Sequence, residues 1–386
     1  MNCMRLIPCH ICQSENMDTF KGYETFARVT SDCKPWPRGG KLGICQDCGC
    51  VQALIDETWE EEANQIYRNY AIWHQSGGAE QSVFDTNSGE PVARSWRIID
   101  RLKREISLPS QGRLLDIGCG NGSLLKSASQ LLPEWALAGT EFDDRYRAQI
   151  EGIPRVERLY AGSLEDVPGA FDLITLCHVF EHWTAPKRLL KLILSKLKTN
   201  GCLLIQVPDF TQNPFELLVA DHCTHFCPSS LAGVVTHAGY TPRILSTNWV
   251  QREITLVAQL SIEPPAPVDF PSQDALVAVE ESLAALNAMR ARACENINRR
   301  QFGIFGTSIA GTWLYGELNA AVRFFVDEDP QRTGKLHLGL PILLPRNVPE
   351  NSLVFVALPD SVASTVSTRL RKVVSRTVEV MTSDQP

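Results

Sequence analysis

The sequence predicts an α/β protein in three parts: a small cysteine-rich module, a central α/β domain and a smaller C-terminal α/β domain. Three observations support this prediction. Two C-x-x-C pairs lie before Val51, strand-like and helical segments alternate over residues 81–262, and a second such alternation follows a proline-rich segment. Alternating strands and helices are typical of a parallel sheet with crossover helices. We place the parts at residues 1–80, 81–262 and 263–386.

The composition is that of an ordinary globular protein, because 44% of the 386 residues are apolar and 21% are charged. The net charge of −7 argues against nucleic acid and anionic lipid as partners. No apolar run reaches the roughly 18–20 residues that span a bilayer, and the first residues lack the apolar stretch of a signal peptide. We therefore expect a cytoplasmic protein whose 13 cysteines are reduced, so that grouped cysteines indicate metal or catalytic sites.

The cysteines of the first module have the spacing of a metal site. Cys9 and Cys12 form one C-x-x-C pair, and Cys45 and Cys48 form the other. Four thiolates at about 2.3 Å complete a tetrahedral zinc site with no open position. We expect structural zinc here, in place of the core that so small a module lacks. Redox thiols and unligated cysteines are the alternatives. Lesser candidate ligands are His10, Cys33 and Cys50.

The central domain contains a strand, a glycine-rich turn and a helix in succession. The strand ends at Asp116, and the glycines that follow place no Cβ in the way of a ligand. The helix that begins near Ser123 directs its N-terminal amides at the same place. A second strand ends at Glu141, where a carboxylate can accept hydrogen bonds from ribose hydroxyls. The glycines of the turn, and two residues of a loop suited to cover an adenine ring, are Gly118, Gly120, Gly122, Ser163 and Leu164.

This part of the chain resembles class I S-adenosylmethionine (SAM) methyltransferases, which have a Rossmann-like fold. The resemblance lies in D-x-G-C-G-x-G, the following acid, and F-D-L-I-x-x-x-H-V-x-E-H. It implies that Asp116 and Gly118 contact the amino-acid part of SAM, that Glu141 contacts the ribose, and that Ser163 with Leu164 contacts the adenine. The stretch that begins at His178 would border the methyl group of the cofactor. Dinucleotide enzymes use a similar turn, but there G-x-G-x-x-G more often follows the strand directly.

Histidines are the candidate catalytic residues. A base that deprotonates the attacking atom would assist methyl transfer, and a histidine with a pKa near neutrality suits that task. The segment Asp221-His-Cys-Thr-His225 follows a predicted strand at the carboxyl edge of the sheet. In a helical turn, His222 and His225 could face one pocket, and Asp221 could orient an imidazole or bind a substrate hydroxyl. Capping and surface hydrogen bonds are the alternative for this segment.

Two further stretches have alternative interpretations. Residues 178–182 spell H-x-x-E-H, a motif of some zinc peptidases. Here the motif follows a buried strand, so we place His182 beside the substrate pocket or give it a structural role. The aromatic residues Tyr67, Tyr70 and Trp73 form either a lid over the cofactor or a buried helix face.

The C-terminal part is predicted to be a smaller Rossmann-like domain. Residues 301–311 form a second strand, glycine turn and helix, and residues 322–326 form the next strand. A full dinucleotide fingerprint is absent from this sequence. Contact with a nucleotide or sugar phosphate at residues 306–308 and a purely structural role are both compatible with this pattern.

The three parts, in this order, resemble the three-domain deoxysugar C-methyltransferases. The shared features are the two C-x-x-C pairs, D-x-G-C-G-x-G, H-V-x-E-H, the Asp221-His222 pair and V-D-E-D-P…G-K…G-x-P-I. The resemblance implies methylation of a carbon beside the ketone of a nucleotide-linked 4-keto sugar. His222 would be the base that forms the enolate, Asp221 and His182 would hold the substrate, and the C-terminal domain would help to hold the nucleotide. The family tends to carry glutamate at position 221 and tyrosine at position 225.

Three other functions are compatible with parts of this sequence. O-methylation of a glycan or another hydroxyl needs a base but no ketone. An RNA base methyltransferase can also join a cysteine-zinc module to a SAM domain, but the charge of −7 disfavours it. A zinc-stapled interaction protein that retains a SAM fold is the non-enzymatic alternative.

Overall fold

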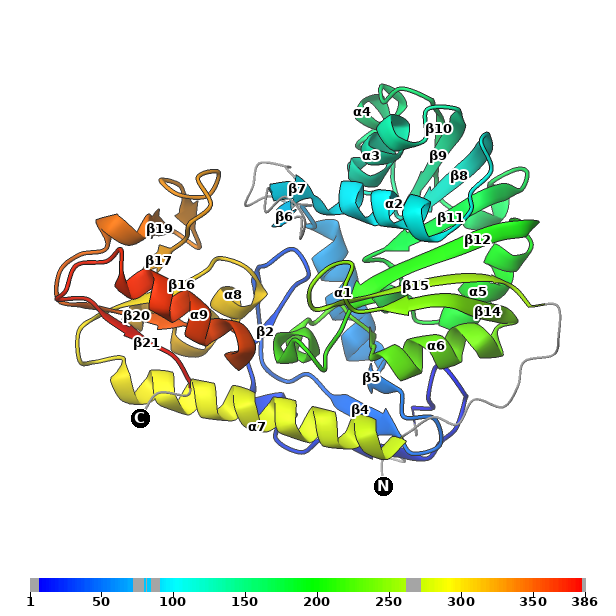
Figure 1. The fold of residues 1–386 in the computed structure, drawn as a ribbon. Coiled ribbons are helices and arrows are strands. Elements are labelled where there is room, and N and C mark those ends of the chain that lie inside the picture. The colour runs from blue at the N-terminus through cyan, green and yellow to red at the C-terminus, as the bar shows by residue number, and fades with distance from the viewer. Residues whose placement is uncertain (1–6, 72–79, 81, 85–90, 262–271, 384–386) are drawn as a thin grey trace.

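The computed structural model describes residues 7–71, 80, 82–84, 91–261 and 272–383. The N-terminal segment lies between the central and C-terminal domains, and one long helix, α7, runs beside all three parts (Figure 1). Among these residues, no helix is both long enough and apolar enough to cross a membrane.

The central domain is a seven-stranded sheet with the order β10-β9-β8-β11-β12-β15-β14, which confirms the predicted α/β fold of this part. Its first five strands are parallel, whereas β15 is antiparallel to both of its neighbours. The strands are β8 (Gly112–Ile117), β9 (Trp135–Glu141), β10 (Val156–Ala161), β11 (Phe171–Cys177), β12 (Leu197–Pro208), β14 (Tyr240–Ser246) and β15 (Glu253–Leu260). The helices are α2 (Arg94–Glu105), α3 (Ser123–Leu131), α4 (Arg147–Glu151), α5 (Pro186–Leu194) and α6 (Pro228–His237).

Two separate apolar cores cover the two faces of this sheet. Successive strand residues point to opposite faces, so Leu114 packs with α2 and α3 whereas Leu115 packs with α5 and α6. Leu173 and Ile174 of β11 divide in the same way. Burial on both faces explains why these strands are nearly continuous apolar runs.

The N-terminal module is completed by a strand from the central domain. Its sheet has the order β1-β4-β5-β13, and its members are β1 (Met17–Thr19), β4 (Leu42–Cys45), β5 (Val51–Ala53) and β13 (Thr224–His225). β13 pairs antiparallel with β5. Helix α1 (Glu57–Arg68) begins where the side chain of Asp56 accepts a hydrogen bond from the Trp59 amide at 2.9 Å. A short hairpin of β2 (Arg28–Val29) and β3 (Pro35–Trp36) and a second one of β6 (Ser82–Phe84) and β7 (Pro91–Ala93) complete the N-terminal half.

The C-terminal domain is a six-stranded sheet with the order β18-β19-β17-β16-β20-β21, parallel except for β18. Its strands are β16 (Gln301–Phe305), β17 (Val322–Val326), β18 (Leu336–His337), β19 (Leu340–Leu343), β20 (Ser352–Val356) and β21 (Glu379–Met381). Its helices are α8 (Ile309–Leu318) and α9 (Asp360–Arg371), and α7 (Ser272–Asn296) precedes them.

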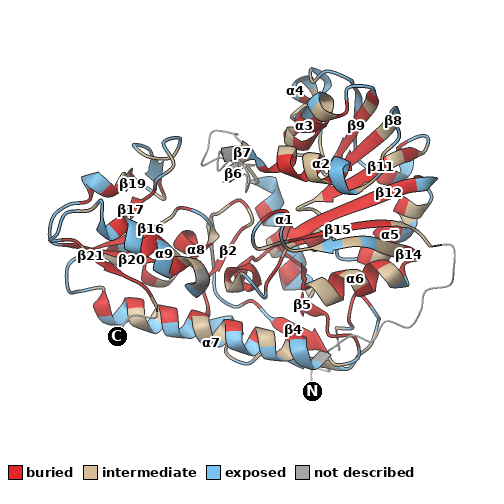
Figure 2. Cartoon of the chain, viewed as in Figure 1, coloured by how far each residue is buried: buried red, intermediate tan, exposed pale blue. Residues whose placement is uncertain are grey.

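One shared core joins the N-terminal module to the C-terminal domain. Phe26 and Val51 of the module pack in one cluster with Phe215, with Leu286 of α7 and with Trp313 of α8. Figure 2 shows buried residues along both large sheets and along α7. The apolar residues of the module are therefore buried in a core that it shares with its neighbours. The sequence of residues 1–80, which is poor in apolar residues, did not indicate this shared core.

Candidate active site

A cavity of about 2040 Å³ lies where the three parts meet. Ligand pockets usually measure about 300–1,000 Å³, so this cavity has room for two ligands of moderate size. Its lining includes Asp116 and Glu141 at the carboxyl ends of β8 and β9, His222 beyond β12, Tyr67 at the end of α1 and Ser308 before α8. The carboxyl ends of parallel strands are where open α/β sheets bind ligands.

Most of the predicted cofactor residues line this cavity. Asp116, Gly118, Gly120, Glu141, Ser163 and Leu164 all line it. The Gly120 amide donates to Glu141 Oε1 at 2.6 Å, so the turn and the second strand are joined directly. Gly122, with φ at 84°, precedes α3 and has the left-handed backbone that glycine adopts without strain.

Asp116 is a buried carboxylate with one hydrogen-bond partner, Thr175 Oγ1 at 2.6 Å. Burial raises the pKa of Asp116 to about 7, and the negative charge of Glu141 adds to the increase. A cationic ligand beside Asp116 would restore its ionised form. SAM carries both an ammonium and a sulfonium group, so this carboxylate fits the amino-acid part of SAM.

Phe142 lines the cavity beside Glu141, a position that the sequence did not predict for it. Its side chain is 90% exposed although it is large and apolar, and it lines the cavity directly after Glu141. An exposed aromatic face next to a ribose-binding carboxylate is suited to pack against an adenine ring. The signal in the sequence was the apolar residue that follows the acid at the end of β9.

Gly118 provides a test of the cofactor cradle. Its φ is 65°, and an added Cβ would lie 2.5 Å from Val179 Cγ2, so either the turn or Val179 must move. We expect Gly118→Ala to raise the Kd for SAM at least about tenfold, which corresponds to about 1.4 kcal/mol, in a calorimetric titration. Gly22→Ala is the matched control, because Gly22 also has a positive φ, of 90°, but has nothing within 4 Å of its added Cβ. An equal loss in both variants would contradict this account of the cradle.

His178 lines the cavity and interacts with two charged side chains, Arg94 and Glu253. Its φ is 54°, and its Nε2 lies 2.8 Å from Arg94 Nη1 and 3.1 Å from Glu253 Oε2. Arg94 also donates to Glu253 Oε1 at 3.0 Å. Burial and Arg94 lower the pKa of His178, but Glu253 and Glu181 outweigh them and raise it above its usual value. Arg94 and Glu253 were not predicted, because they are far from His178 in the sequence. The fold brings them together, with Arg94 at the start of α2 and Glu253 at the start of β15.

His222 lines the cavity and is paired with a carboxylate that the sequence analysis did not single out. Its Nδ1 lies 2.5 Å from Oε1 of Glu216, which belongs to the 3-10 helix η5 (Pro214–Leu218). Burial opposes protonation of His222, but the charge of Glu216 outweighs it and raises the pKa of His222 to about 9. Burial likewise disfavours the charge of Glu216, but His222 and His225 lower its pKa to about 2.

His182 lies beside His222, and both residues line the cavity. The two imidazole rings meet edge to face with centroids 4.5 Å apart. The Tyr67 hydroxyl lies 3.0 Å from His182 Nδ1. Glu181, which is buried, has a carboxylate oxygen within 4.8 Å of a nitrogen of each histidine. Glu181, His182 and His222 therefore form one polar cluster with the aromatic residue of α1.

Asp221 and His225 lie behind this cluster and are not among the lining residues. Asp221 is fully buried, and its carboxylate accepts hydrogen bonds from the Ser31 amide at 2.8 Å and the Ser31 hydroxyl at 2.5 Å. The prediction of a helical turn that lets His222 and His225 face one pocket is wrong. Residues 224–225 form β13, because they pair with β5, and the His225 side chain is 1% exposed.

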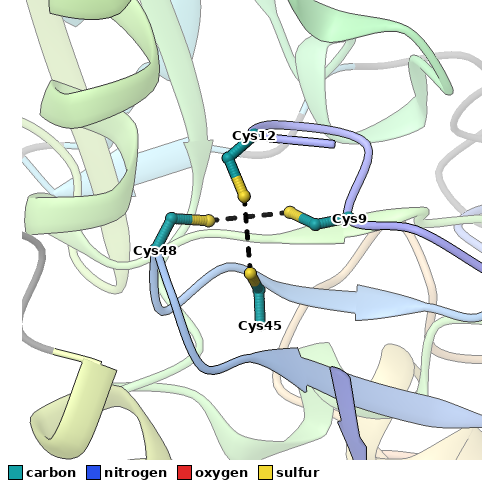
Figure 3. A group of neighbouring side chains, drawn as sticks. All are labelled: Cys9, Cys12, Cys45 and Cys48. Carbon is teal, nitrogen blue, oxygen red and sulfur yellow. Dashed lines mark hydrogen bonds between the residues drawn. The ribbon is translucent and has the colours of Figure 1, made fainter. Parts of the chain in front are cut away.

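The four predicted zinc ligands converge on one point (Figure 3). The sulfurs of Cys9 and Cys48 are 3.6 Å apart, those of Cys12 and Cys45 are 3.5 Å apart, and all four lie within 4.8 Å of one another. A tetrahedron of bonds of about 2.3 Å has edges of about 3.8 Å, so the four thiols fit zinc. Cys33, Cys50 and His10 are not members of this cluster.

The N-terminal module holds the loop that carries His222. His10, between two of the cysteines, has its Nε2 2.7 Å from Thr224 Oγ1. The Ala53 amide donates to the Cys223 carbonyl at 3.1 Å, and Ser31 holds Asp221 as described above. The segment around His222 is thus fixed by side chains and backbone from three places in the N-terminal module.

The C-terminal domain closes the other side of the cavity. Ser308, Ile309 and Ala310 at the start of α8 line it, together with Arg332. Arg332 Nη1 donates to Thr307 Oγ1 at 3.2 Å and lies 3.6 Å from Asp327 Oδ2. Helix N-termini and arginine side chains both favour anionic groups. Of the aromatic residues considered as a lid, Tyr67 and Tyr70 line the cavity, whereas Trp73 is outside the described residues.

Comparison with known proteins identifies the central domain. Residues 93–243 match the family described as "Methyltransferase domain". A "Ubiquinone biosynthesis O-methyltransferase" of Xanthomonas campestris pv. campestris (strain B100) is 28% identical over 131 residues, which are 31% of this chain and 53% of that protein. A "Trans-aconitate 2-methyltransferase" of Enterobacter sp. (strain 638) is 33% identical over 138 residues, 33% of this chain and 52% of that protein.

Among solved structures, a SAM-dependent methyltransferase from Clostridium acetobutylicum is 13% identical and has a TM-score of 0.37, covering 53% of this chain and 98% of that one. The chain spans about half the length of the curated relatives that it matches. The family match, the sheet order and the glycine turn show that the central part of this chain is a SAM-dependent methyltransferase domain.

Proposed function

We propose that the protein is a SAM-dependent methyltransferase that methylates a carbon beside the ketone of a nucleotide-linked deoxysugar through an enolate. The observation that supports this best is the single cavity that joins the cofactor residues, His222 and the start of α8. A substrate of this cavity would need one end that reacts at His222 and an anionic end that suits Arg332 and the start of α8. A nucleotide-linked sugar meets that requirement, because its phosphates are anionic and its sugar ring lies at one end.

The residues of the cavity divide into three tasks. Asp116, the glycine turn and Glu141 would hold SAM, which when bound supplies an electrophilic methyl group. His222 would act on the sugar, with His182 and Tyr67 beside it. Arg332 and the first amides of α8 would bind the phosphates. Asp221 and His225 would support His222 from behind rather than touch the substrate.

The proton transfer uses the ring nitrogen of His222 that Glu216 leaves free. His222 Nε2 removes a proton from the carbon beside the ketone, and the electrons of that C–H bond form the enolate. The enolate carbon then bonds to the methyl carbon, and the electron pair of the broken S–C bond stays on sulfur as S-adenosylhomocysteine leaves. Removal of the first proton by a positioned base typically accelerates such a reaction by about 10²–10⁴-fold.

Arg332 provides a test of the phosphate site. A hydrogen bond to a charged group contributes about 1.5–3 kcal/mol, so we expect Arg332→Gln to raise the KM for the nucleotide-linked sugar about tenfold or more. The Kd for SAM should not change, because Arg332 belongs to the C-terminal domain and the predicted cofactor residues belong to the central domain. Arg323→Gln, at an exposed position on β17, is the matched control. An unchanged KM in Arg332→Gln would remove the C-terminal domain from substrate binding.

O-methylation is the second candidate function, and the curated relatives favour it, since one is named as an O-methyltransferase. A base at His222 would serve a hydroxyl as well as a carbon. Incubation of the protein with SAM carrying a ¹³C-labelled methyl group and a panel of nucleotide-linked 4-keto sugars separates the two. We expect the ¹³C chemical shift of a methyl group on carbon. A methyl group on oxygen would overturn C-methylation.

A further inference from the structure

We infer that Glu216 is a positioning residue for proton transfer by His222, fixing the ring so that Nδ1 faces the carboxylate and Nε2 faces the substrate. This inference rests on the proposed function, in which His222 is the base. The residue stands six positions before His222 in the sequence and lies in the cavity lining with it. None of the motifs in this sequence includes it.

The geometry determines which nitrogen is available. Nδ1 of His222 lies 2.5 Å from Glu216 Oε1, within hydrogen-bonding distance, so this nitrogen carries a proton that it donates to the carboxylate. Among the described residues, no side chain or carbonyl forms a hydrogen bond with Nε2 of His222. Glu216 therefore favours the tautomer of His222 that has its proton on Nδ1 and can accept a proton at Nε2. A carboxylate has the same effect on the histidine of a catalytic triad.

Glu216 is itself held in place for this task. It is 4% exposed and lies between two buried imidazoles, since His225 Nδ1 is 3.6 Å from the same Oε1 atom. That distance is too long for a hydrogen bond, so His225 does not compete with His222 for the oxygen. The neighbours Phe215, Leu217 and Leu218 are buried in the core shared by the three parts, which anchors the short helix that carries Glu216.

The charges around His222 make the role of Glu216 measurable. Carboxylates face His222 from three segments: Glu216 in η5, Glu181 in the helix η4 (Phe180–His182) and Asp221 in the loop. All three raise the pKa of His222, Glu216 most, whereas burial lowers it. The imidazoles of His182 and His225 also face this group, and the charges of His222 and of each of them disfavour one another. The balance leaves the pKa of His222 at about 9.

The pH profile of turnover should carry the signature of this pair. Only neutral His222 can accept the proton, so kcat/KM of the wild type should rise with pH to a plateau whose midpoint is near 9. In Glu216→Gln we expect the midpoint to fall towards 6.5, the usual pKa of a histidine. It should remain somewhat above that value, because Glu181 and Asp221 still raise the pKa of His222. The plateau at high pH should also fall about tenfold or more, because a weaker base transfers the proton more slowly. The two profiles should therefore cross between the two midpoints, and below the crossing the variant should be the faster enzyme, a result that a merely unfolded variant would not produce.

A second measurement does not depend on the reaction. The imidazole nitrogens of ¹⁵N-histidine-labelled protein report each titration, and the signal missing in His222→Gln identifies His222. We expect this signal to titrate near pH 9 in the wild type and at lower pH in Glu216→Gln, while Glu216→Asp, which keeps the charge, stays near the wild type. Asp172→Asn, which removes a carboxylate that contacts Arg113 and Lys198 instead, is the control.

Two outcomes would overturn the inference. One is a His222 signal that titrates near 6.5 in the wild type, a result that does not require Glu216→Gln to fold. The other is an unchanged midpoint in a folded Glu216→Gln. If no substrate is methylated at all, the proposed function fails, and the ¹⁵N titration still decides whether Glu216 sets the proton of His222.

Discussion

His222→Gln should lower kcat for methyl transfer by about 10²–10⁴-fold, the contribution typical of a positioned acid–base group, when the rates are compared above pH 9, where His222 is neutral. Glutamine has similar bulk and keeps a donor that can reach Glu216, but it cannot accept a proton at neutral pH. The His222 side chain lines the cavity but is not among the residues predicted to bind SAM. We therefore expect the Kd for SAM to stay within about threefold of the wild type. Calorimetry for SAM and initial rates with the nucleotide-linked sugar separate the two effects.

The matched control for this variant is His237→Gln. His237 ends α6, where its Nδ1 lies 2.9 Å from the Gly233 carbonyl, and it is not among the residues that line the cavity. Its replacement should leave kcat unchanged. A His222→Gln enzyme that retains more than about half of the wild-type kcat at saturating SAM and substrate would exclude His222 as the base.

Removing one zinc thiolate should have the largest effect on stability. In Cys45→Ser we expect the zinc content to fall from one ion per chain to a small fraction, since three thiolates bind a structural zinc ion far less tightly than four. Binding of structural zinc contributes on the order of 10 kcal/mol in small metal domains, which is comparable with the whole stability of a typical protein. The N-terminal module should therefore unfold at a much lower temperature than in the wild type.

The effect should reach the loop that carries His222. Thr224 is held by His10, and β13 pairs with β5 next to Cys50. We expect amide hydrogen exchange over residues 221–226 to become at least about tenfold faster in Cys45→Ser, in proportion to the loss of local stability. Cys294→Ser, at an exposed thiol on α7, is the control. Full zinc content in Cys45→Ser, or unchanged exchange over this loop, would contradict the account.

The sequence was sufficient for the features that repeat a local pattern. The strand before Asp116 and the glycine turn could be predicted because buried parallel strands are apolar runs and because glycines mark a close approach of ligand and backbone. The cluster of Cys9, Cys12, Cys45 and Cys48 could be predicted because each pair is local, and only the meeting of the two pairs depends on the fold.

The sequence was insufficient where function depends on contacts between distant or irregular segments. Glu216 approaches His222 through a 3-10 turn that has no periodic pattern. Ser31 binds Asp221 across 190 positions of the chain. The two residues of β13 are too few to show the alternation that marks a strand, so the spacing of His222 and His225 suggested a helical turn that pairing with β5 replaces.

Deuterium exchange without the methyl donor is the most direct test of the central claim that His222 removes a proton from carbon. The protein is incubated in heavy water with nucleotide-linked 4-keto sugars, and mass spectrometry follows the incorporation of deuterium. We predict incorporation above the rate without protein, and loss of that excess in His222→Gln. If the wild type binds SAM but exchanges no sugar, or if His222→Gln exchanges as fast as the wild type, the enolate mechanism with His222 as its base is wrong.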